Sequence, residues 1–306
     1  MGHSERIRVG IVGAGGIAPP HVKAWLTLGA EVLLLRRGGA AELAAAHGLE
    51  VIDDLDGLLD RVDLVDILSP TATHAGIARA AITRGRHVVC EKPLAMTAAE
   101  AAGIAEAAAA AGVRLFPAHV VRYFGDYARM KDQADAGTVG DLVELKFQRT
   151  VAAPAAGWFY EADAGGGLIR DLMIHDLDQA RWLAGPVVEV SARQDAGATP
   201  PLTAEVVLTH ASGAVSRVSA GWLAPGTPFR SAAEITGTRA ILRADTSAPV
   251  SAPADPYLAQ LVDFAEALAS GGPARVLPED GVAAVALVDA ALASLAAGAP
   301  ARVGAG

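Results

Sequence analysis

The first third of the chain alternates short apolar runs with helix-forming segments, and this alternation restricts the fold more than any other feature. The strand-like runs are residues 8–12, 31–35, 50–52, 62–68, 87–90 and 113–116. Thr97 with Glu100 forms the pattern of a capping box, which predicts a helix start at that point. Apolar strands in repeated β-α-β order indicate a parallel sheet covered by helices on both faces. We therefore predict a doubly wound α/β domain over residues 1–120.

The pattern changes after about residue 120. Further strands are expected over residues 142–151, 187–193, 203–209, 214–221, 231–236 and 240–243, and helices over 167–183, 257–269 and 281–297. Short turns at residues 210–213 and 237–238 join neighbouring strands as hairpins. Residues 121–306 are therefore predicted to form an α+β domain with a mostly antiparallel open sheet.

Composition supports a folded chain of two domains. Of its 306 residues, 52% are hydrophobic, and the mean hydropathy is +0.34. The 25 Lys and Arg residues against 34 Asp and Glu residues give a net charge of -9. That balance disfavours nucleic acid or an anionic membrane surface as a partner.

The sequence predicts a cytoplasmic location. The polar start leads directly into a strand, so no signal peptide is expected. The apolar window over residues 281–298 is mostly alanine and contains Asp289, which favours a buried helix over a membrane span. Cys90 is the single cysteine and excludes an internal disulfide. We predict that it is a buried structural thiol, and we predict no metal site because no clustered ligand spacing is present.

A glycine-rich loop follows the first predicted strand and fits the pattern G-x-G-x-x-G/A. In this pattern Gly13 permits the tight turn, Gly15 lets the backbone approach a pyrophosphate, and Ala18 keeps the helix close to the strand. The helix N-terminus adds the positive end of its dipole. We predict that Gly13, Gly15, Gly16 and Ile17 bind a dinucleotide, the alternative being a purely structural turn.

Two arginines stand where a dinucleotide-binding domain often places an acidic residue. Arg36 and Arg37 end the second predicted strand. A carboxylate there would repel a 2′-phosphate, whereas a guanidinium can bind it through two hydrogen bonds. The sequence therefore predicts NADP in preference to NAD. The alternative is that both arginines are solvated surface charges and that the chain accepts either cofactor.

Three motifs in order carry a resemblance to a known family. Glu91-Lys92-Pro93 follows the fifth strand, residues 69–74 read Ser-Pro-Thr-Ala-Thr-His, and residues 165–178 contain Asp171 and His175 four positions apart. Together with the glycine loop, these segments resemble the glucose-fructose oxidoreductase / inositol dehydrogenase (Gfo/Idh/MocA) family. The resemblance implies a Rossmann domain, an α+β domain whose open sheet often forms a subunit interface, and an active site between the domains. It implies hydride transfer between NAD(P) and a secondary alcohol or ketone of a sugar, inositol or related polyhydroxy compound.

The resemblance also assigns residues. Lys92 matches the family's catalytic lysine, and Asp171 with His175 matches its Asp-x-x-x-His pair. The residues that it places along the cofactor are Ser69, Pro70, Thr71, His74, Glu91 and Lys92. The predicted substrate contacts are Lys92, Arg122, Trp158, Asp171 and His175, although a packing role is equally open for Arg122 and Trp158.

Physical chemistry supports the catalytic assignments independently. Oxidation of an alcohol needs a base for the hydroxyl proton, and histidine has an unperturbed pKa of about 6.5. Residues four apart on a helix share a face, so Asp171 can orient the ring of His175. Lys92 brings a positive charge to the carboxyl end of a parallel strand, where it can stabilise a negative oxygen.

Two other functions and the oligomeric state stay open at this point. Some relatives resemble hydrolases or lyases that use a transient oxidation, and some family branches are non-catalytic NAD(P)-binding regulators. The small-molecule substrate is the predicted partner, and we expect a homo-oligomer with a dimer favoured.

Overall fold

The structure is a computed structural model that describes residues 6–195, 197, 200–245 and 255–303. The chain divides into two compact units, which are Met1–Tyr123 with Ala254–Val282 (unit 1) and Phe124–Pro253 with Ala283–Gly306 (unit 2). The first division falls after Tyr123, whereas the sequence predicted one boundary after residue 120. A further difference lies in residues 255–282, which the sequence assigned to the second domain. They belong to unit 1 because helix α8 (Pro256–Ser270) packs against helix α1 (Ala18–Thr27).

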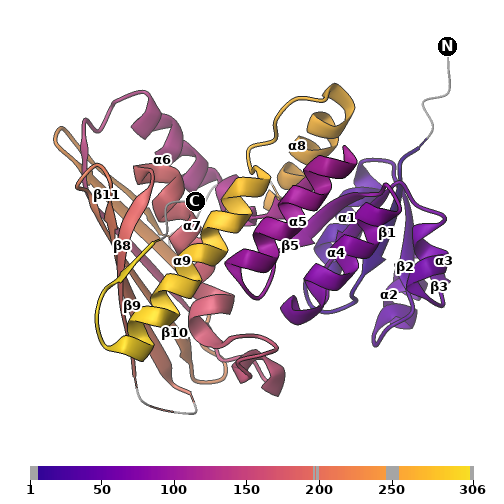
Figure 1. The fold of residues 1–306 in the computed structure, drawn as a ribbon, viewed down its shortest axis with the longest axis horizontal. Helices are drawn as coiled ribbons and strands as arrows, with labels where there is room; N and C mark the ends of the chain where they lie inside the picture. The colour runs from indigo at the N-terminus through magenta and orange to yellow at the C-terminus, as the bar shows by residue number, and fades with distance from the viewer. Residues whose placement is uncertain (1–5, 196, 198–199, 246–254, 304–306) are drawn as a thin grey trace. The chain divides into compact units, whose positions relative to one another are not determined.

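Unit 1 is built on sheet A, whose six parallel strands lie in the order β3-β2-β1-β4-β5-β6. Figure 1 labels β1, β2, β3 and β5 of this sheet. The strands are β1 (Arg8–Val12), β2 (Glu31–Leu35), β3 (Glu50–Ile52), β4 (Leu64–Ile67), β5 (His87–Glu91) and β6 (Leu115–Ala118). The other helical segments are α2 (Ala40–His47), α3 (Leu55–Leu59), η1 (Thr71–Thr73), α4 (His74–Thr83), α5 (Ala98–Ala111) and η2 (Val120–Tyr123). This is the strand order of a doubly wound dinucleotide-binding fold, and it confirms the predicted fold class.

A buried apolar cluster fastens α1, α2 and α8 to sheet A. The rings of Phe116 in β6 and Phe264 in α8 stack with their centroids 4.9 Å apart. Helix α5 packs beside α4 and begins at the predicted capping box. There the Thr97 hydroxyl oxygen accepts from the Glu100 N–H at 3.2 Å, and the Glu100 carboxylate accepts from the Thr97 N–H at 3.1 Å.

Unit 2 is built on sheet B, whose strands lie in the order β12-β11-β7-β10-β9-β8-β13. They are β7 (Leu142–Ala152), β8 (Val187–Gln194), β9 (Leu202–His210), β10 (Val215–Leu223), β11 (Arg230–Gly237), β12 (Ile241–Asp245) and β13 (Ala301–Arg302). The helical segments are α6 (Gly125–Asp135), η3 (Gly157–Tyr160), η4 (Ile169–Met173), α7 (Ile174–Ala184) and most of α9 (Pro278–Ala297). Strand β7 pairs with β10 in parallel, and the other pairs in the described strands are antiparallel. The two predicted hairpins join β9 to β10 and β11 to β12, so the predicted mostly antiparallel sheet is confirmed.

Sheet B has one buried face and one accessible face. Along β7, Leu145, Phe147 and Arg149 are buried, while Lys146 and Gln148 between them are exposed. This alternation is typical of an antiparallel sheet that packs on a core with one side only.

Helix α9 is apolar and long enough to cross a membrane by length and composition, and it is the one such helix in the described part of the chain. Its contacts are those of a core helix. Val285 and Val288 are fully buried, and the Ser294 hydroxyl oxygen accepts from the Ala192 N–H of β8 at 3.0 Å. Burial of these residues agrees with the buried helix expected from the sequence.

Candidate active site

The glycine loop between β1 and α1 leaves open space where a dinucleotide is expected. Gly13 has a φ of +117°, and a Cβ at this position would lie 2.5 Å from the carbonyl carbon of Leu68. Gly15 and Gly16 are exposed, and a Cβ on either would meet no atom within 4 Å. The first glycine therefore lets the loop lie against the chain after β4, and the next two leave the backbone open to a pyrophosphate. These residues fit the expected cofactor.

The helix after this loop differs from the expectation in one respect. Pro19 and Pro20 occupy the first turn of α1, and proline has no backbone N–H. The Ala18 N–H is bonded to the Gly15 carbonyl oxygen at 3.0 Å. The helix N-terminus therefore offers its dipole but few donors of its own, and a phosphate there would depend on the amides of the glycine loop.

The arginine pair lies beside the glycine loop. A Cβ on Gly39, whose φ is +80°, would lie 3.0 Å from the Ala14 carbonyl oxygen, so the turn after β2 packs against that loop. Arg36 and Arg37 in this turn are exposed. However, the Nε of Arg36 donates to the carboxylate of Asp53, which follows β3 and was not singled out from the sequence. One of the two predicted phosphate ligands is therefore already paired with an acid.

The four predicted cofactor contacts after β4 differ in accessibility. Pro70 is exposed, Ser69 is half-buried, and Thr71 and His74 are buried. His74 Nε2 lies 2.6 Å from the Ser69 carbonyl oxygen, and His74 Nδ1 lies 2.8 Å from the carbonyl oxygen of Pro93. Burial lowers the pKa of His74, and the two carbonyl oxygens oppose that shift. His74 thus joins the loop after β4 to the loop after β5.

Lys92 follows β5 and is half-buried between two buried neighbours, Glu91 and Pro93. The Lys92 N–H donates to Oε2 of Glu91 at 3.0 Å. Burial would raise the pKa of Glu91, but its contact with His21 and the nearby positive charges hold that pKa below its usual range. Burial raises the pKa of the Cys90 thiol in the same strand, which favours a structural thiol.

A buried polar cluster behind this loop was not predicted. His21 of α1 has Nδ1 2.8 Å from Oδ2 of Asp66 and Nε2 3.3 Å from Oε1 of Glu91. Trp25 Nε1 donates to the same Asp66 oxygen at 2.7 Å. The available signal was Asp66 itself, because a carboxylate within an apolar strand needs a partner once the strand is buried. Its partners come from a helix far away in sequence, which the strand pattern alone does not reveal.

In unit 2, Asp171 and His175 are the accessible positions of a buried segment. Every other residue from 168 to 180 is buried, and the structure describes all of them. Residues 169–173 form a π-helical turn that continues into α7, where the sequence predicted a single α-helix. Such turns inside helices occur frequently at functional sites. Both side chains therefore belong to positions that the core does not enclose.

The two other predicted substrate contacts have different surroundings. Arg122 is 1% exposed in unit 1, and its Nη1 donates to Asp280 Oδ2 at 2.9 Å and to the Arg275 carbonyl oxygen at 3.3 Å. That arrangement favours the packing role which the sequence left open. Trp158 is half-buried in unit 2 and stacks on Phe159 with the ring centroids 3.8 Å apart.

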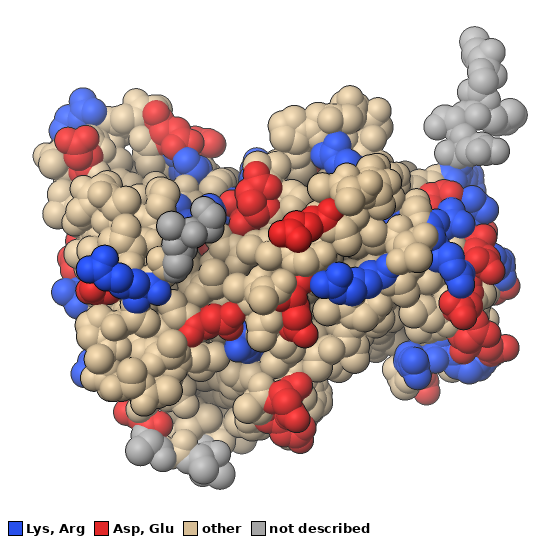
Figure 2. Space-filling view, viewed as in Figure 1, with Lys and Arg blue, Asp and Glu red and all other residues tan. Residues whose placement is uncertain are grey.

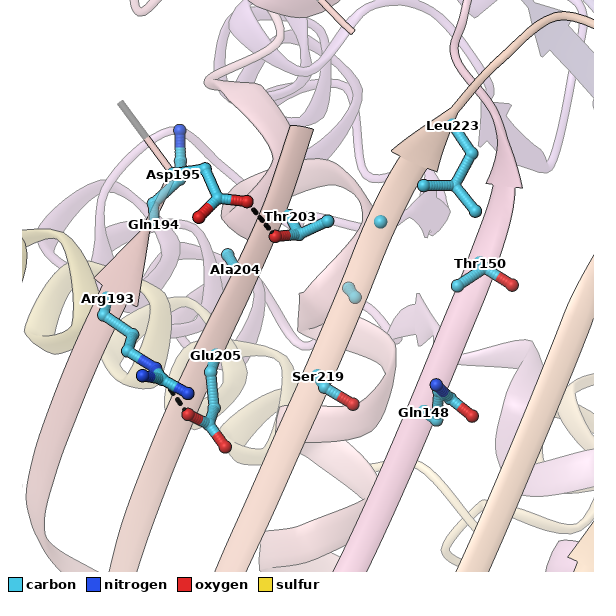
Figure 3. Close-up of a pocket in the computed structure, with 12 residues that line it drawn as sticks. Gln148, Thr150, Arg193, Gln194, Asp195, Thr203, Ala204, Glu205, Ser219 and Leu223 are labelled. Atoms are coloured by element: carbon cyan, nitrogen blue, oxygen red, sulfur yellow. Dashed lines mark hydrogen bonds and ion pairs between the residues drawn. The ribbon is translucent and has the colours of Figure 1, made fainter. Parts of the chain in front are cut away.

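A polar hollow lies on the accessible face of sheet B (Figure 3). Arg193 Nε donates to the Glu205 carboxylate at 2.6 Å, and the Thr203 hydroxyl donates to Asp195. The residues that line this hollow include none of the predicted catalytic or cofactor residues.

Charge is distributed without a dominant patch on the face shown in Figure 2, where basic and acidic side chains are interspersed. Among the residues that the structure describes, no group of three or more His, Cys, Asp and Glu side chains could hold a metal ion.

Comparison with known proteins gives consistent matches. Residues 7–119 match the model described as "Oxidoreductase family, NAD-binding Rossmann fold", and residues 127–243 match the GFO/IDH/MocA C-terminal domain. Inositol 2-dehydrogenase of Rubrobacter xylanophilus is 30% identical over an alignment 342 positions long, which covers 99% of this chain and 94% of that relative. The rhizopine catabolism protein MocA of Rhizobium meliloti is 29% identical, with 94% of each chain covered.

Solved structures agree with these matches. The crystal structure of GenD2 from gentamicin A biosynthesis, in complex with NAD, is 28% identical and has a TM-score of 0.88. The alignment covers 100% of this chain and 98% of that one. With both domains matched in order and a relative 30% identical over nearly its whole length, the chain belongs to the Gfo/Idh/MocA family of oxidoreductases, as its glycine loop and Glu91-Lys92-Pro93 segment predicted.

Proposed function

We propose that the protein transfers a hydride between NAD(P) and a secondary alcohol or ketone of a sugar, inositol or related polyhydroxy compound. Two similar relatives are named inositol 2-dehydrogenase and 1,5-anhydro-D-fructose reductase, and both names describe redox chemistry on a polyhydroxy ring. These names support the substrate class and leave the individual substrate to experiment.

The main support for this proposal is that the loops after β1, β4 and β5 lie at the same edge of sheet A. Strands β1, β4 and β5 are neighbours, so the loops that follow them share the edge where α/β proteins bind ligands. Gly13 lies against the backbone of Leu68, and His74 joins the loops after β4 and β5. The open glycines and the half-buried Lys92 therefore belong to the same edge.

The proposed chemistry assigns one task to each side chain. A bound nicotinamide supplies the hydride acceptor for oxidation of an alcohol, or the hydride donor for the reverse reaction. His175 takes the proton of the substrate hydroxyl, and Asp171 orients the imidazole and stabilises its protonated form. The Lys92 ammonium group holds the substrate oxygen and stabilises its negative charge.

For the cofactor, we propose NADP in preference to NAD. Arg36 and Arg37 support it because both are exposed and lie in a turn that packs on the glycine loop. Asp53 opposes a preference for NADP. The Asp53 carboxylate occupies one edge of the Arg36 guanidinium and would repel a 2′-phosphate. The proposed preference is therefore modest, and NAD is accepted as well. Contacts from Glu91 and from the loop after β4 complete the proposed cofactor site.

We also propose a cytoplasmic homo-oligomer, with a dimer favoured, that uses the accessible face of sheet B. The polar side chains of this face, among them Gln148, Ser219 and the Arg193–Glu205 pair, suit a polar contact between identical surfaces. Sedimentation of the purified chain measures the oligomeric state directly.

Calorimetric titration with NADPH and NADH, followed by a turnover assay, tests the redox proposal. We expect NADPH to bind more tightly, and NADP to be reduced with inositol or NADPH oxidised with 1,5-anhydro-D-fructose. Lys92→Ala should keep the cofactor Kd and lose most turnover. Folded, cofactor-free protein that binds neither cofactor contradicts the proposal. Product release without net cofactor turnover would instead favour a hydrolase or lyase.

A further inference from the structure

Two buried histidines contact the loop that carries Lys92, one on each side of it. On the N-terminal side, His21 Nε2 lies 3.3 Å from Oε1 of Glu91, whose Oε2 accepts from the Lys92 N–H at 3.0 Å. On the C-terminal side, His74 Nδ1 lies 2.8 Å from the Pro93 carbonyl oxygen. The two histidines are 0% and 1% exposed. We call this pair of histidines the histidine clamp.

His21 connects the Lys92 loop to two other elements of unit 1. Its Nδ1 lies 2.8 Å from Oδ2 of Asp66 in β4, and Trp25 Nε1 donates to the same oxygen at 2.7 Å. His21 and Trp25 both belong to α1, the helix that follows the glycine loop. One imidazole therefore joins the expected cofactor helix, the strand β4 and the Lys92 loop.

The charges around His21 balance when its ring is protonated. The Asp66 and Glu91 carboxylates both face the imidazole, and Lys92 lies next to Glu91. Burial alone would lower the pKa of His21, but the two carboxylates raise it to about 10. The Tyr257 ring of α8, 5.7 Å away between centroids, stays a neutral phenol because burial raises its pKa to about 12. With the ring protonated, the 3.3 Å contact between His21 Nε2 and Glu91 Oε1 is a buried ion pair, and its charge attraction holds the Glu91 side chain.

His74 fixes the other side of the loop through two backbone carbonyls. Its Nε2 lies 2.6 Å from the Ser69 carbonyl oxygen, opposite the nitrogen that faces Pro93. A neutral ring donates to one of these acceptors, and a protonated ring donates to both. In either state the ring fills the space between the two loops and sets their separation.

We propose that His21 and His74 are positioning residues, which hold residues 91–93 in place and so aim the ammonium group of Lys92. For His74 this role replaces the direct cofactor contact that the family resemblance implies. The inference rests on the proposed function, because the aim of Lys92 affects turnover only if Lys92 acts on the substrate. A purely structural role would stabilise unit 1 as a whole without a selective effect on this loop.

Two variants and a matched control separate these roles. The first variant is His74→Gln, and the second combines His21→Gln with Asp66→Asn, so that no carboxylate is left unbalanced in place of the ring. The control is His210→Gln in unit 2. His210 is also 1% exposed and also bridges two hydrogen-bond partners, a backbone carbonyl oxygen at 2.9 Å and a serine hydroxyl at 2.8 Å. Its loss carries a comparable cost in packing but does not affect the Lys92 loop.

The first measurement needs neither cofactor nor substrate. Hydrogen–deuterium exchange of the amides of residues 91, 92, 94 and 95 should become about fivefold faster in both clamp variants, as expected for the loss of one hydrogen bond or one ion pair of similar strength. Exchange of this segment should be unchanged in the control. The second measurement is steady-state turnover with NADP and inositol. We expect kcat to fall about 100-fold in the clamp variants through misplacement of Lys92, with the substrate KM close to that of the unmodified protein.

The possible results separate the clamp from the proposed function. Unchanged exchange at residues 91–95, or faster exchange spread evenly over unit 1, overturns the clamp even where the unmodified protein is active. Faster local exchange with an unchanged kcat overturns the positioning role. If the unmodified protein oxidises or reduces no polyol or ketone, the proposed function fails, and the exchange data alone decide whether the histidines hold the loop.

Discussion

Arg149 of β7 and Asp176 of α7 form a two-pronged ion pair inside unit 2, with Nε 2.9 Å from Oδ2 and Nη2 2.7 Å from Oδ1. Their side chains are 2% and 0% exposed. Burial would lower the pKa of Arg149, and the charge of Asp176 raises it. Because Asp176 directly follows His175, the pair fastens the helix with the proposed base to sheet B.

We expect Asp176→Asn to destabilise unit 2 by about 3–5 kcal/mol, because it leaves a buried guanidinium without a charged partner. Denaturant unfolding of the full chain measures this loss. The control is Asp135→Asn, which breaks an accessible pair with Lys131 on α6 and should cost less than about 1 kcal/mol. Equal losses in the two variants would mean that the buried pair contributes no more than the accessible one.

Features encoded by neighbouring residues could be predicted from the sequence. The capping box of Thr97 and Glu100 and the apolar strands of sheet A each depend on a few consecutive positions. The glycine loop is also local, because the positive φ of Gly13 follows from the tight turn after β1. Family resemblance, and not periodicity, supplied Lys92 as a candidate.

Features that depend on distant contacts could not be predicted. Asp66 meets His21 across 45 positions, and Arg36 meets Asp53 across 17. The assignment of α8 to the second domain was wrong for the same reason, because no local sequence pattern shows which sheet an amphipathic helix will cover. The π-helical turn before α7 was missed because its composition does not differ from that of an α-helix.

Substitutions in the glycine loop should separate folding from cofactor binding. Gly13→Ala should destabilise the protein by about 2 kcal/mol or more, because a Cβ would overlap the backbone of Leu68 at a positive φ. Gly15→Ala should leave the Tm unchanged, since a Cβ there meets no atom within 4 Å. It should nevertheless weaken NADPH binding about tenfold, or ~1.4 kcal/mol, by blocking the approach of the pyrophosphate. If Gly15→Ala binds NADPH as tightly as the unmodified protein, the dinucleotide does not bind at this loop.

Asp53 should limit the preference for NADP. Asp53→Asn removes a negative charge beside Arg36, so we expect NADPH to bind about threefold more tightly while NADH binding stays the same. Asp56→Asn is the control, because Asp56 pairs with Arg84 instead. Arg36→Asp with Arg37→Ala should shift the preference to NAD. If NADPH affinity survives that double change, neither arginine binds the 2′-phosphate.

Loss of the proton from His21 should make unit 1 less stable at alkaline pH. Burial alone would lower the pKa of His21, but Asp66 and Glu91 raise it from 6.5 to about 10. A group whose pKa rises on folding stabilises the folded state fully below its unfolded pKa, and this contribution is lost as the pH rises through the folded pKa. The window of loss is therefore about pH 6.5 to about pH 10. Within it, one bound proton changes the free energy of unfolding by about 1.4 kcal/mol per pH unit.

The reference for this measurement is the double variant His21→Gln with Asp66→Asn, which lacks the imidazole and one of its two carboxylate partners. Lysines and tyrosines elsewhere titrate equally in both proteins, so their effects cancel in the difference. Between about pH 7 and about pH 9.5, the free energy of unfolding of the unmodified protein should fall relative to that of the variant. Denaturant unfolding at several pH values provides both curves. Parallel curves across this range would show that the His21 ring is neutral, so that no charge attraction from His21 holds Glu91 in place.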